Sequence, residues 1–112
     1  PGALTIVFPC QIKLVPELVR GGGQNLGVRM PNHKVPLELI KGVGVPILGP
    51  SANFSDKPTP YKYKDLDSEF LKNVDYVLPG ICPIEMVSTV IDCSQKLWKI
   101  IRQGAVKVSG IK

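Results

Sequence analysis

The stretch from residue 50 to residue 55 holds the side chains best suited to bind an anion. It reads Pro-Ser-Ala-Asn-Phe-Ser and follows an apolar run at residues 46–48. The hydroxyls of Ser51 and Ser55, the amide of Asn53 and the backbone N–H groups between them are the donors that a phosphate or carboxylate needs. Loops that follow strands are also where α/β sheets bind ligands. The alternative is that these side chains make only local turn hydrogen bonds.

Two arginines are candidates for gripping such an anion. Arg29 and Arg102 lie in segments predicted to be strands and have apolar neighbours. A buried guanidinium without a partner would be costly to desolvate, so we expect each to contact an anion. That anion is either a structural carboxylate, from Asp65, Asp75 or Asp92, or a substrate phosphate or carboxylate held by two parallel hydrogen bonds.

The remaining reactive residues argue against several other kinds of site. His33 is the only histidine; because no G-x-S-x-G elbow accompanies it, we expect it to cap or bond locally. The sequence has no Walker loop and no G-x-G-x-x-G fingerprint. Cys10, Cys82 and Cys93 are odd in number and lack the C-x-x-C spacing. This pattern argues against disulfides and zinc, and it indicates a reducing, cytosolic compartment.

The composition is that of a soluble globular protein. Hydrophobic residues make up 44% of the 112 residues and charged residues 21%, which is too apolar for a disordered chain. The net charge of +5 would favour acidic partners such as nucleotides or RNA. Lys and Arg are scattered without a run of like charges, however, so a solvated basic surface explains them as well. With no stretch of membrane-spanning length and no signal sequence, we expect a soluble, untargeted chain.

The apolar pattern predicts an α/β sheet of mixed direction. Apolar, β-rich runs bounded by Gly, Pro or Asn predict strands, and Leu37 and Ile40, three residues apart, predict one face of a short helix. Strands alternating with helices, followed by a run of strands, are typical of such a sheet. The predicted strands are residues 4–8, 26–30, 46–48, 74–78, 88–92 and 98–102, the last two paired through residues 93–97, and the predicted helices are 36–41 and 66–73.

The start of the sequence predicts an incomplete sheet. Pro1-Gly2-Ala3 leads directly into the apolar run at residues 4–8, and a buried strand at a terminus usually pairs with strands that precede it. We therefore expect a cut chain of one small domain, with an exposed apolar edge.

Five stretches resemble the YrdC family, in the family's order and at similar spacings over nearly the whole chain. The resemblance implies a YrdC-like twisted mixed sheet with short helices, of which residues 1–112 are the C-terminal part of a single domain. The stretches are PGALTIVF at 1–8, GVRMPNH at 27–33, GVPILGPSANFSDKPTP at 44–60, STVID at 88–92 and KIIRQGAV at 99–106.

The resemblance implies an L-threonylcarbamoyladenylate synthase. Such an enzyme converts threonine, bicarbonate and ATP, with Mg²⁺ on the triphosphate, to threonylcarbamoyl-AMP and pyrophosphate. A partner complex then transfers the threonylcarbamoyl group to tRNA. No protein nucleophile is needed, because the substrate's carbamate attacks the α-phosphate and the protein positions the reactants. The residues implied to bind are Thr5 in the pocket, Ser51, Asn53 and Ser55 in the loop that holds the phosphates and the threonylcarbamoyl group, and Ser88 and Arg102 on the later strands.

Two departures from the family pattern lead us to expect that the chain is inactive alone. Residues 85–89 read Glu-Met-Val-Ser-Thr where the family reads G-x-E-S-T. The family's K-x-R and S-x-x-T segments, which supply much of the ATP and threonine site, are absent. The alternatives are a non-catalytic RNA-binding module and a carbamoyl-handling domain of the hydrogenase-maturation type, which would come with acylphosphatase and zinc-finger segments.

Overall fold

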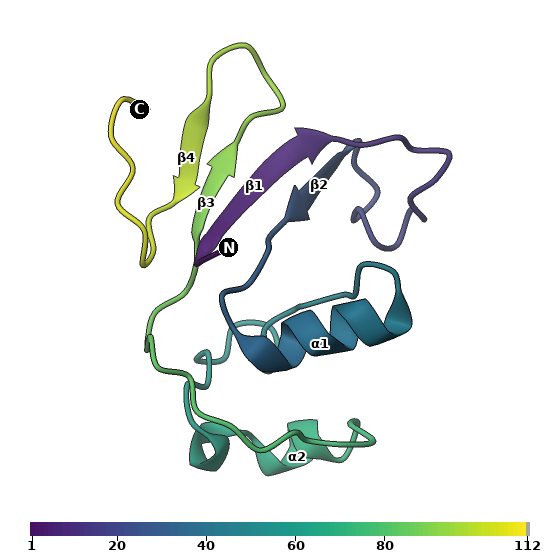
Figure 1. Ribbon diagram of the computed structural model, residues 1–112, viewed down its shortest axis with the longest axis vertical. Helices are drawn as coiled ribbons and strands as arrows, with labels where there is room; N and C mark the ends of the chain where they lie inside the picture. The colour runs from purple at the N-terminus through teal and green to yellow at the C-terminus, as the bar shows by residue number, and fades with distance from the viewer. Residues whose placement is uncertain (112) are drawn as a thin grey trace. The chain divides into compact units, whose positions relative to one another are not determined.

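A computed structural model describes residues 1–111 as two compact units (Figure 1). The first combines Pro1–Leu48 with the segment from Val87 onward, and the second is Gly49–Met86. The first unit contains a sheet and a helix, whereas the second consists of loops and two short helical turns. Sequence-distant segments therefore build the first unit, and one continuous segment builds the second.

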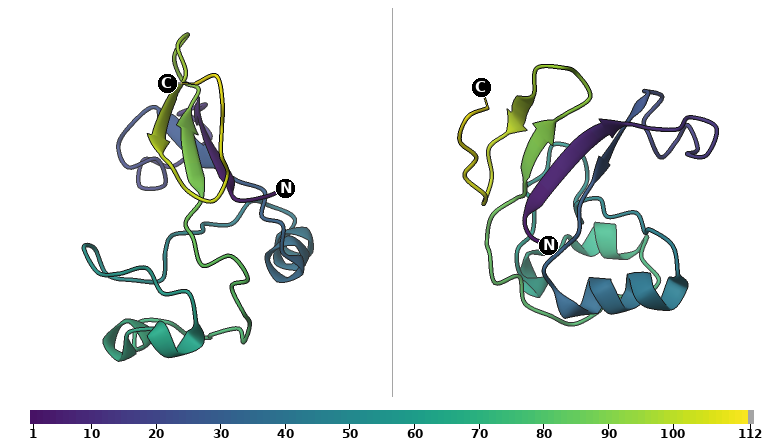
Figure 2. Two further views of the ribbon diagram at one scale, coloured as in Figure 1. Left: turned by 90° about the vertical axis from the view of Figure 1, so that its left-hand side faces the viewer. Right: turned by 45° about the horizontal axis from the view of Figure 1, so that its top comes forward.

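The first unit is organised around a four-stranded sheet in the order β2-β1-β3-β4 (Figure 2). Its strands are β1 (Leu4–Pro9), β2 (Asn25–Val28), β3 (Thr89–Asp92) and β4 (Lys99–Arg102). β1 pairs with β3 in parallel, whereas β2 and β4 are antiparallel to their neighbours. The mixed direction, the hairpin of β3 and β4 and the predicted strands at 4–8, 26–30, 88–92 and 98–102 are confirmed, apart from shifts at their ends.

The strand β1 does not depend on residues before it for its pairing. It lies in the interior of the sheet, and both of its neighbours follow it in the sequence. The expectation that β1 would pair with preceding strands is therefore wrong. Within residues 1–111 the open edges of the sheet are instead those of β2 and β4.

The helix of the first unit, α1 (Lys34–Val43), begins and ends at well-defined caps. The Nδ1 atom of His33 accepts a hydrogen bond from the N–H of Val35 at 3.3 Å, so the prediction of a capping histidine is confirmed. Pro36 lies in the first turn, where its missing N–H removes no helical bond. Gly44 has a left-handed φ of 77° and donates its N–H to Ile40 at 2.9 Å, which is the usual end of a helix.

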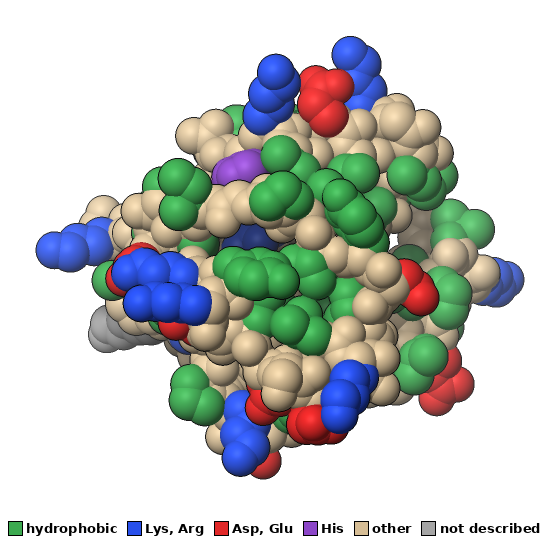
Figure 3. Space-filling model, turned by 90° about the horizontal axis from the view of Figure 1, so that it is seen from below, with side chains coloured by type: hydrophobic (Ala, Val, Ile, Leu, Met, Phe, Trp, Pro, Cys, Tyr) green, Lys and Arg blue, Asp and Glu red, His purple; other side chains and the backbone are tan. Residues whose placement is uncertain are grey.

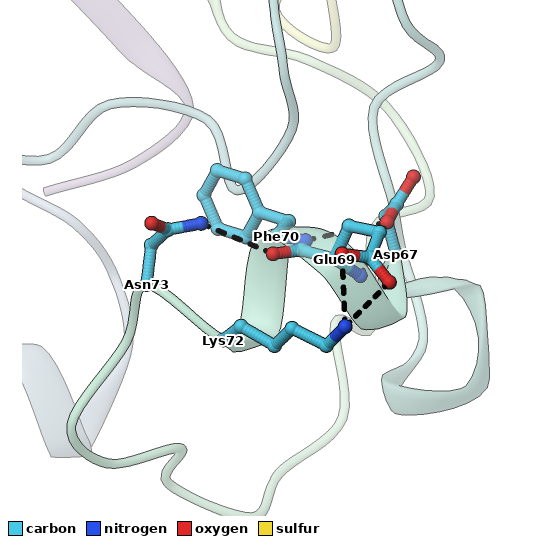
Figure 4. A network of polar contacts seen from close by, with 5 residues as sticks. All are labelled: Asp67, Glu69, Phe70, Lys72 and Asn73. Atoms are coloured by element: carbon cyan, nitrogen blue, oxygen red, sulfur yellow. Dashed lines mark hydrogen bonds and ion pairs between the residues drawn. The ribbon is translucent and has the colours of Figure 1, made fainter.

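The second unit contains the turn η1 (Tyr63–Asp65) and the short helix α2 (Ser68–Leu71). The Asp67 carboxylate caps α2 by accepting from the N–H of Glu69 at 2.8 Å and from that of Phe70 at 3.2 Å (Figure 4). At the other end Lys72 forms an ion pair with Glu69, and the Asn73 amide donates to the Glu69 carbonyl at 3.0 Å. These contacts hold a helix that would be too short to form by itself.

Two predicted strands of the sequence are wrong, and one predicted helix is shorter than expected. Residues 46–48 and 74–78 form no strand. The first run is short and begins with Pro46, which cannot donate to a ladder, and no strand among the described residues pairs with either run. The helix predicted at 66–73 is confined to α2, which begins only at Ser68, after the capping residue Asp67.

Very little of the chain is buried. Of the described residues, only Ser88, Thr89 and Ile91 are buried, and all three lie in or next to β3. Large apolar side chains such as Leu18, which is 94% exposed, remain in contact with solvent, and many are visible on the face shown in Figure 3. The central strand β3 is thus the best-packed part of the structure.

Candidate functional site

Thr5, Ser88 and Arg102 come together on one face of the sheet. The Thr5 and Ser88 hydroxyl oxygens are 2.9 Å apart, a hydrogen bond in which either can donate. The Arg102 side chain donates from Nη2 to Ser88 Oγ and from Nε to the Ser88 carbonyl, both at 3.0 Å. Three of the six predicted binding residues therefore form one hydrogen-bonded cluster, here called the Thr5 cluster.

The register of the sheet explains why these side chains share a face. Thr5 on β1 lies opposite Val90 on β3, and Val90 lies opposite Arg102 on β4. Side chains of directly paired residues point to the same side of a sheet. Ser88 precedes Val90 by two residues and so points to that side too.

A β-bulge turns Arg102 toward this face. Val90 pairs with Arg102, but the next residue of β3, Ile91, pairs with Ile100, which leaves Ile101 as an extra residue on β4. In a regular ladder Ile100 and Arg102 would point to the same side of the sheet. The extra residue shifts the alternation by one, so that Ile100 lies with Ile91 and Arg102 lies with Val90.

The Thr5 cluster exposes its guanidinium and hides its central hydroxyl. Arg102 is exposed, whereas Ser88 is only 6% exposed. A guanidinium has five N–H donors, and the bonds to Ser88 use two of them. The other three, together with the half-buried Thr5 hydroxyl, are the groups that can reach a ligand, while Ser88 mainly links them.

Arg29 and Arg102 were expected to need anions because they would be buried, and this expectation of burial is wrong. Both Arg29 and Arg102 are exposed, and Arg29 lies just beyond the end of β2. Neither guanidinium is therefore desolvated strongly enough to require a counter-ion. In the described part of the chain no carboxylate forms an ion pair with Arg102, and its partner is the hydroxyl and carbonyl of Ser88.

Thr89 and Gly104 support the cluster from behind and were missed by the sequence analysis. Thr89 is fully buried, and its Oγ1 bonds to the backbone of Gly104 and Val106. Gly104 lies directly against the backbone of Val87 and Ser88. A threonine in a β-rich run and a glycine after a strand are ordinary in their context, so no sequence signal distinguishes them.

The other three predicted residues, Ser51, Asn53 and Ser55, lie in the second unit. Ser51 and Ser55 are exposed. The Asn53 side chain donates from Nδ2 to the carbonyls of Phe54 and Lys57, at 2.9 and 3.0 Å. The alternative of local turn hydrogen bonds thus holds for Asn53. That Ser51, Asn53 and Ser55 bind the same ligand as Arg102 stays a prediction.

The amide of Asn53 has one atom without a hydrogen-bond partner. Both of its N–H groups face backbone carbonyls, so the orientation of the amide is fixed and Oδ1 points away from them. Oδ1 is buried and has no hydrogen-bond partner among the described residues. Asn53 lines a hollow of about 160 Å³ together with Phe54, Lys57, Asp65 and Asp67. Asn53 therefore has no free N–H donor of the kind that a phosphate would need.

The aromatic ring of Phe54 fixes this loop to the helix α2. It meets Phe70 edge to face, with ring centroids 5.4 Å apart, which is a favourable aromatic geometry. The loop also turns tightly, since Asp56 has a left-handed φ of 64° and the Lys57 N–H donates to the Phe54 carbonyl at 3.1 Å. Ser55 is therefore held between the ring contact of Phe54 and the tight turn at Asp56.

Asp92 is a carboxylate whose pKa is shifted. Hydrogen bonding from Ser94, whose N–H donates to Asp92 Oδ1 at 2.8 Å, lowers the pKa of Asp92 below its ordinary value, and Lys99 adds to the effect. Asp92 lies at the far end of β3 from Ser88. Its role is therefore to fix the turn of the hairpin.

The described residues offer no feature of a metal centre or a membrane span. Nowhere in residues 1–111 do three or more His, Cys, Asp or Glu side chains gather as they would to hold a metal ion. Cys10, Cys82 and Cys93 are free thiols. None of the helices in that range has the length and apolar character needed to cross a membrane.

Comparison with known proteins gives consistent matches. The Sua5, YciO and YrdC family model, described as telomere recombination, matches residues 1–104. The threonylcarbamoyl-AMP synthase of Bacillus subtilis (strain 168) is 37% identical over 110 residues, which are 95% of this chain and 31% of that protein. That of Pyrococcus abyssi is 34% identical over 113 residues, covering 100% of this chain and 33% of that protein.

Solved structures agree with the sequence relatives. A doubly substituted Sua5 of P. abyssi superposes with a TM-score of 0.86 at 36% identity, covering 94% of this chain and 32% of that one. A P. abyssi Sua5 complexed with L-threonine gives a TM-score of 0.78 at 34% identity, covering 93% and 31%. The predicted fold class is confirmed, and the chain spans about a third of the length of these relatives.

Proposed function

Because the chain belongs to the Sua5, YciO and YrdC family, we propose that it takes part in the synthesis of threonylcarbamoyl-AMP. In this reaction threonine, bicarbonate and ATP give threonylcarbamoyl-AMP and pyrophosphate. The observation that carries the proposal is the Thr5 cluster, in which an exposed guanidinium is held in place by Ser88. The threonine complex of the P. abyssi Sua5 supports threonine as the amino-acid substrate.

Arg102 suits the charge changes of this reaction. When the carbamate attacks the α-phosphate, negative charge grows on phosphate oxygens, and donors fixed in advance stabilise that charge best. Arg102 meets this requirement, since two bonds to Ser88 fix its plane and three N–H donors remain. We propose that it binds a phosphate or the threonine carboxylate beside the Thr5 hydroxyl. Mg²⁺ is expected to arrive on the triphosphate, as is usual at nucleotide sites.

The loop at residues 51–55 is proposed to bind the substrate through a different kind of contact. Asn53 can only accept through Oδ1 while its N–H groups bond to the loop backbone. A phosphate oxygen is therefore an unsuitable partner for the Asn53 amide. The exposed hydroxyls of Ser51 and Ser55 remain as donors for the phosphates.

The wider role is also a proposal. We propose that the product passes to a complex that modifies tRNA in the cytoplasm, and that residues 1–112 form the C-terminal part of a single YrdC-like domain. The net charge of +5 is compatible with a nearby RNA, but the scattered positions of Lys and Arg favour no particular surface for it. The enzyme is therefore preferred to a non-catalytic RNA-binding module.

The test compares Arg102→Ala with Arg20→Ala in the intact protein. Both variants lose one positive charge, but within residues 1–111 the Arg20 side chain bonds only to carbonyls of its own loop, at Val15 and Gly23. A charge-assisted hydrogen bond contributes about 1.5–3 kcal/mol, so Arg102→Ala should weaken ATP binding by roughly ten- to a hundredfold. Arg20→Ala should leave the affinity almost unchanged.

The measurements are calorimetric titration with Mg-ATP and threonine-dependent release of pyrophosphate. An equal loss in both variants would mean that net charge, and not the Thr5 cluster, binds the nucleotide. Salt-dependent RNA binding without any pyrophosphate release would instead support the RNA-binding alternative.

A further inference from the structure

The Thr89 hydroxyl is unusual because it is both fully buried and fully bonded. Thr89 has no exposed surface. Its Oγ1 donates to the Val106 carbonyl at 2.6 Å and accepts from the N–H groups of Gly104 and Val106 at 3.0 and 3.1 Å. A hydroxyl has one donor and two acceptor positions. All three are used to hold the segment from Gly104 to Val106 against the start of β3, so Thr89 has nothing left for a ligand.

Gly104 is the point at which this segment touches β3. A Cβ atom at residue 104 would lie 2.3 Å from the Val87 carbonyl oxygen and 2.6 Å from that of Ser88. No side chain fits there without movement of the backbone. The next residue, Ala105, donates its N–H to the same Val87 carbonyl at 3.0 Å. The segment from Gly104 to Val106 is therefore fixed to residues 87–89 from two sides.

The same short stretch of backbone carries the Thr5 cluster. Ser88 lies between Val87 and Thr89, and its carbonyl and hydroxyl are the two groups to which Arg102 bonds. Ser88 and Thr89 alternate along the strand, so Ser88 points toward the cluster and Thr89 points away from it. A displacement at Thr89 or Gly104 must move the Ser88 carbonyl, and the Arg102 side chain follows that carbonyl.

We propose that Thr89 and Gly104 are positioning residues of the site. They hold the Ser88 backbone against the segment that follows β4, and through it they fix the plane of the Arg102 guanidinium. Neither residue contacts the ligand. The inference relies on the proposed function only for its kinetic consequence, because the orientation of Arg102 can be measured by itself.

The choice of threonine at this position supports a positioning role. Valine has nearly the same shape and would fill the buried space, but it would leave the N–H groups of Gly104 and Val106 without their partner. The Val106 carbonyl would keep only its bond from the Gln103 side chain. Serine would keep the hydroxyl and lose only a methyl group. The two substitutions therefore separate the hydrogen bonds from the packing.

The experiment measures Arg102 directly in Thr89→Val and Thr89→Ser variants of the intact protein. The first measurement is the NMR signal of the Arg102 Nε–H group, identified by its loss in Arg102→Lys. Because that proton bonds to the Ser88 carbonyl, we expect it to exchange slowly with water in the wild type and in Thr89→Ser. In Thr89→Val we expect its position to shift and its exchange to become faster, although Arg102 itself is unchanged.

The second measurement is pyrophosphate release. A small misplacement of a binding group can lower catalysis by up to about a hundredfold, so kcat/KM for ATP should fall by roughly ten- to a hundredfold in Thr89→Val at a temperature where the variant is folded. Thr89→Ser should restore most of it. Gly42→Ala is the control, because a Cβ at residue 42 meets nothing within 4 Å.

The possible results separate the two proposals. An Arg102 signal that is unmoved in a folded Thr89→Val variant overturns the positioning role, whatever happens to activity. The same role is overturned if Thr89→Ser is impaired as strongly as Thr89→Val. If the Arg102 signal moves as expected but the wild type releases no pyrophosphate, the positioning role holds and the proposed enzyme function fails.

Discussion

Replacing Gly104 by alanine tests the close contact on which the first unit depends. The new Cβ would lie 2.3 Å from the Val87 carbonyl oxygen, whereas such contacts normally begin near 3.4 Å. The segment after β4 must therefore retreat by about 1 Å, as expected for an overpacked site. That movement would stretch the bonds from the Gly104 N–H to Thr89 and from the Ala105 N–H to Val87, both now 3.0 Å.

The magnitude follows from these two effects. Overpacking costs about 1–3 kcal/mol, and leaving the buried Thr89 hydroxyl partly unsatisfied costs about 1–3 kcal/mol more. The two overlap, because the same movement relieves the first and causes the second, so we expect a total of about 2–4 kcal/mol. For a unit of this size each kcal/mol lowers Tm by about 4–8 °C.

The assay is urea unfolding and thermal unfolding of the variant beside Gly42→Ala. Residue 42 lies in α1 with open space around it, so the same chemical change there should stabilise the protein by about 0.4–1 kcal/mol. The opposite signs of the two effects are the expected result. A Gly104→Ala protein as stable as the wild type would mean that the segment after β4 is not held against β3 as described.

Two further predictions concern caps and charge. Asp92→Asn keeps an oxygen that can accept from the Ser94 N–H but removes the charge. Because folding lowers the pKa of Asp92, the ionised carboxylate stabilises the fold at pH values above its ordinary pKa of 3.8. This contribution is lost as the pH falls through the lowered pKa of the folded state. The variant should therefore be less stable than the wild type at pH 7 in urea unfolding and should match it in strong acid, and a stability difference independent of pH would contradict the prediction. His33→Ala removes the cap of α1 and should lower the free energy of unfolding by about 0.5–2 kcal/mol, whereas His33→Asn should retain it. If both variants unfold like the wild type, the Nδ1 contact contributes nothing measurable.

Local sequence patterns predicted the elements whose formation depends mainly on their own residues. The run Leu-Thr-Ile-Val-Phe of β1 is β-branched and apolar, and the β3 and β4 runs are separated by a short polar connection. Residues 46–48 have a similar composition but find no partner strand among the described residues. A strand exists only through its neighbours, so composition alone could not exclude this one.

The site was predicted less well than the fold, for a related reason. Thr5, Ser88 and Arg102 are far apart in the sequence, and only the family resemblance suggested that they belong together. Their contact depends on the register of three strands and on one extra residue in β4. Thr89 could not be distinguished by sequence, because its importance lies in three bonds to a backbone segment more than a dozen residues away.

The extra residue in β4 makes the direction of Arg102 depend on strand register as well as on residue type. If β4 kept its length but lost the bulge, Val90 would pair with Ile101 and the guanidinium would point to the opposite side of the sheet. Deleting Ile101 would instead leave Arg102 opposite Val90 in a regular ladder, on the side that it occupies now. A deletion at residue 101 is thus a change that should keep the direction of Arg102, and one that a scan of substitutions would never sample. Among natural variants, a β4 that is one residue shorter and has no bulge can therefore present the same arginine to the same face of the sheet.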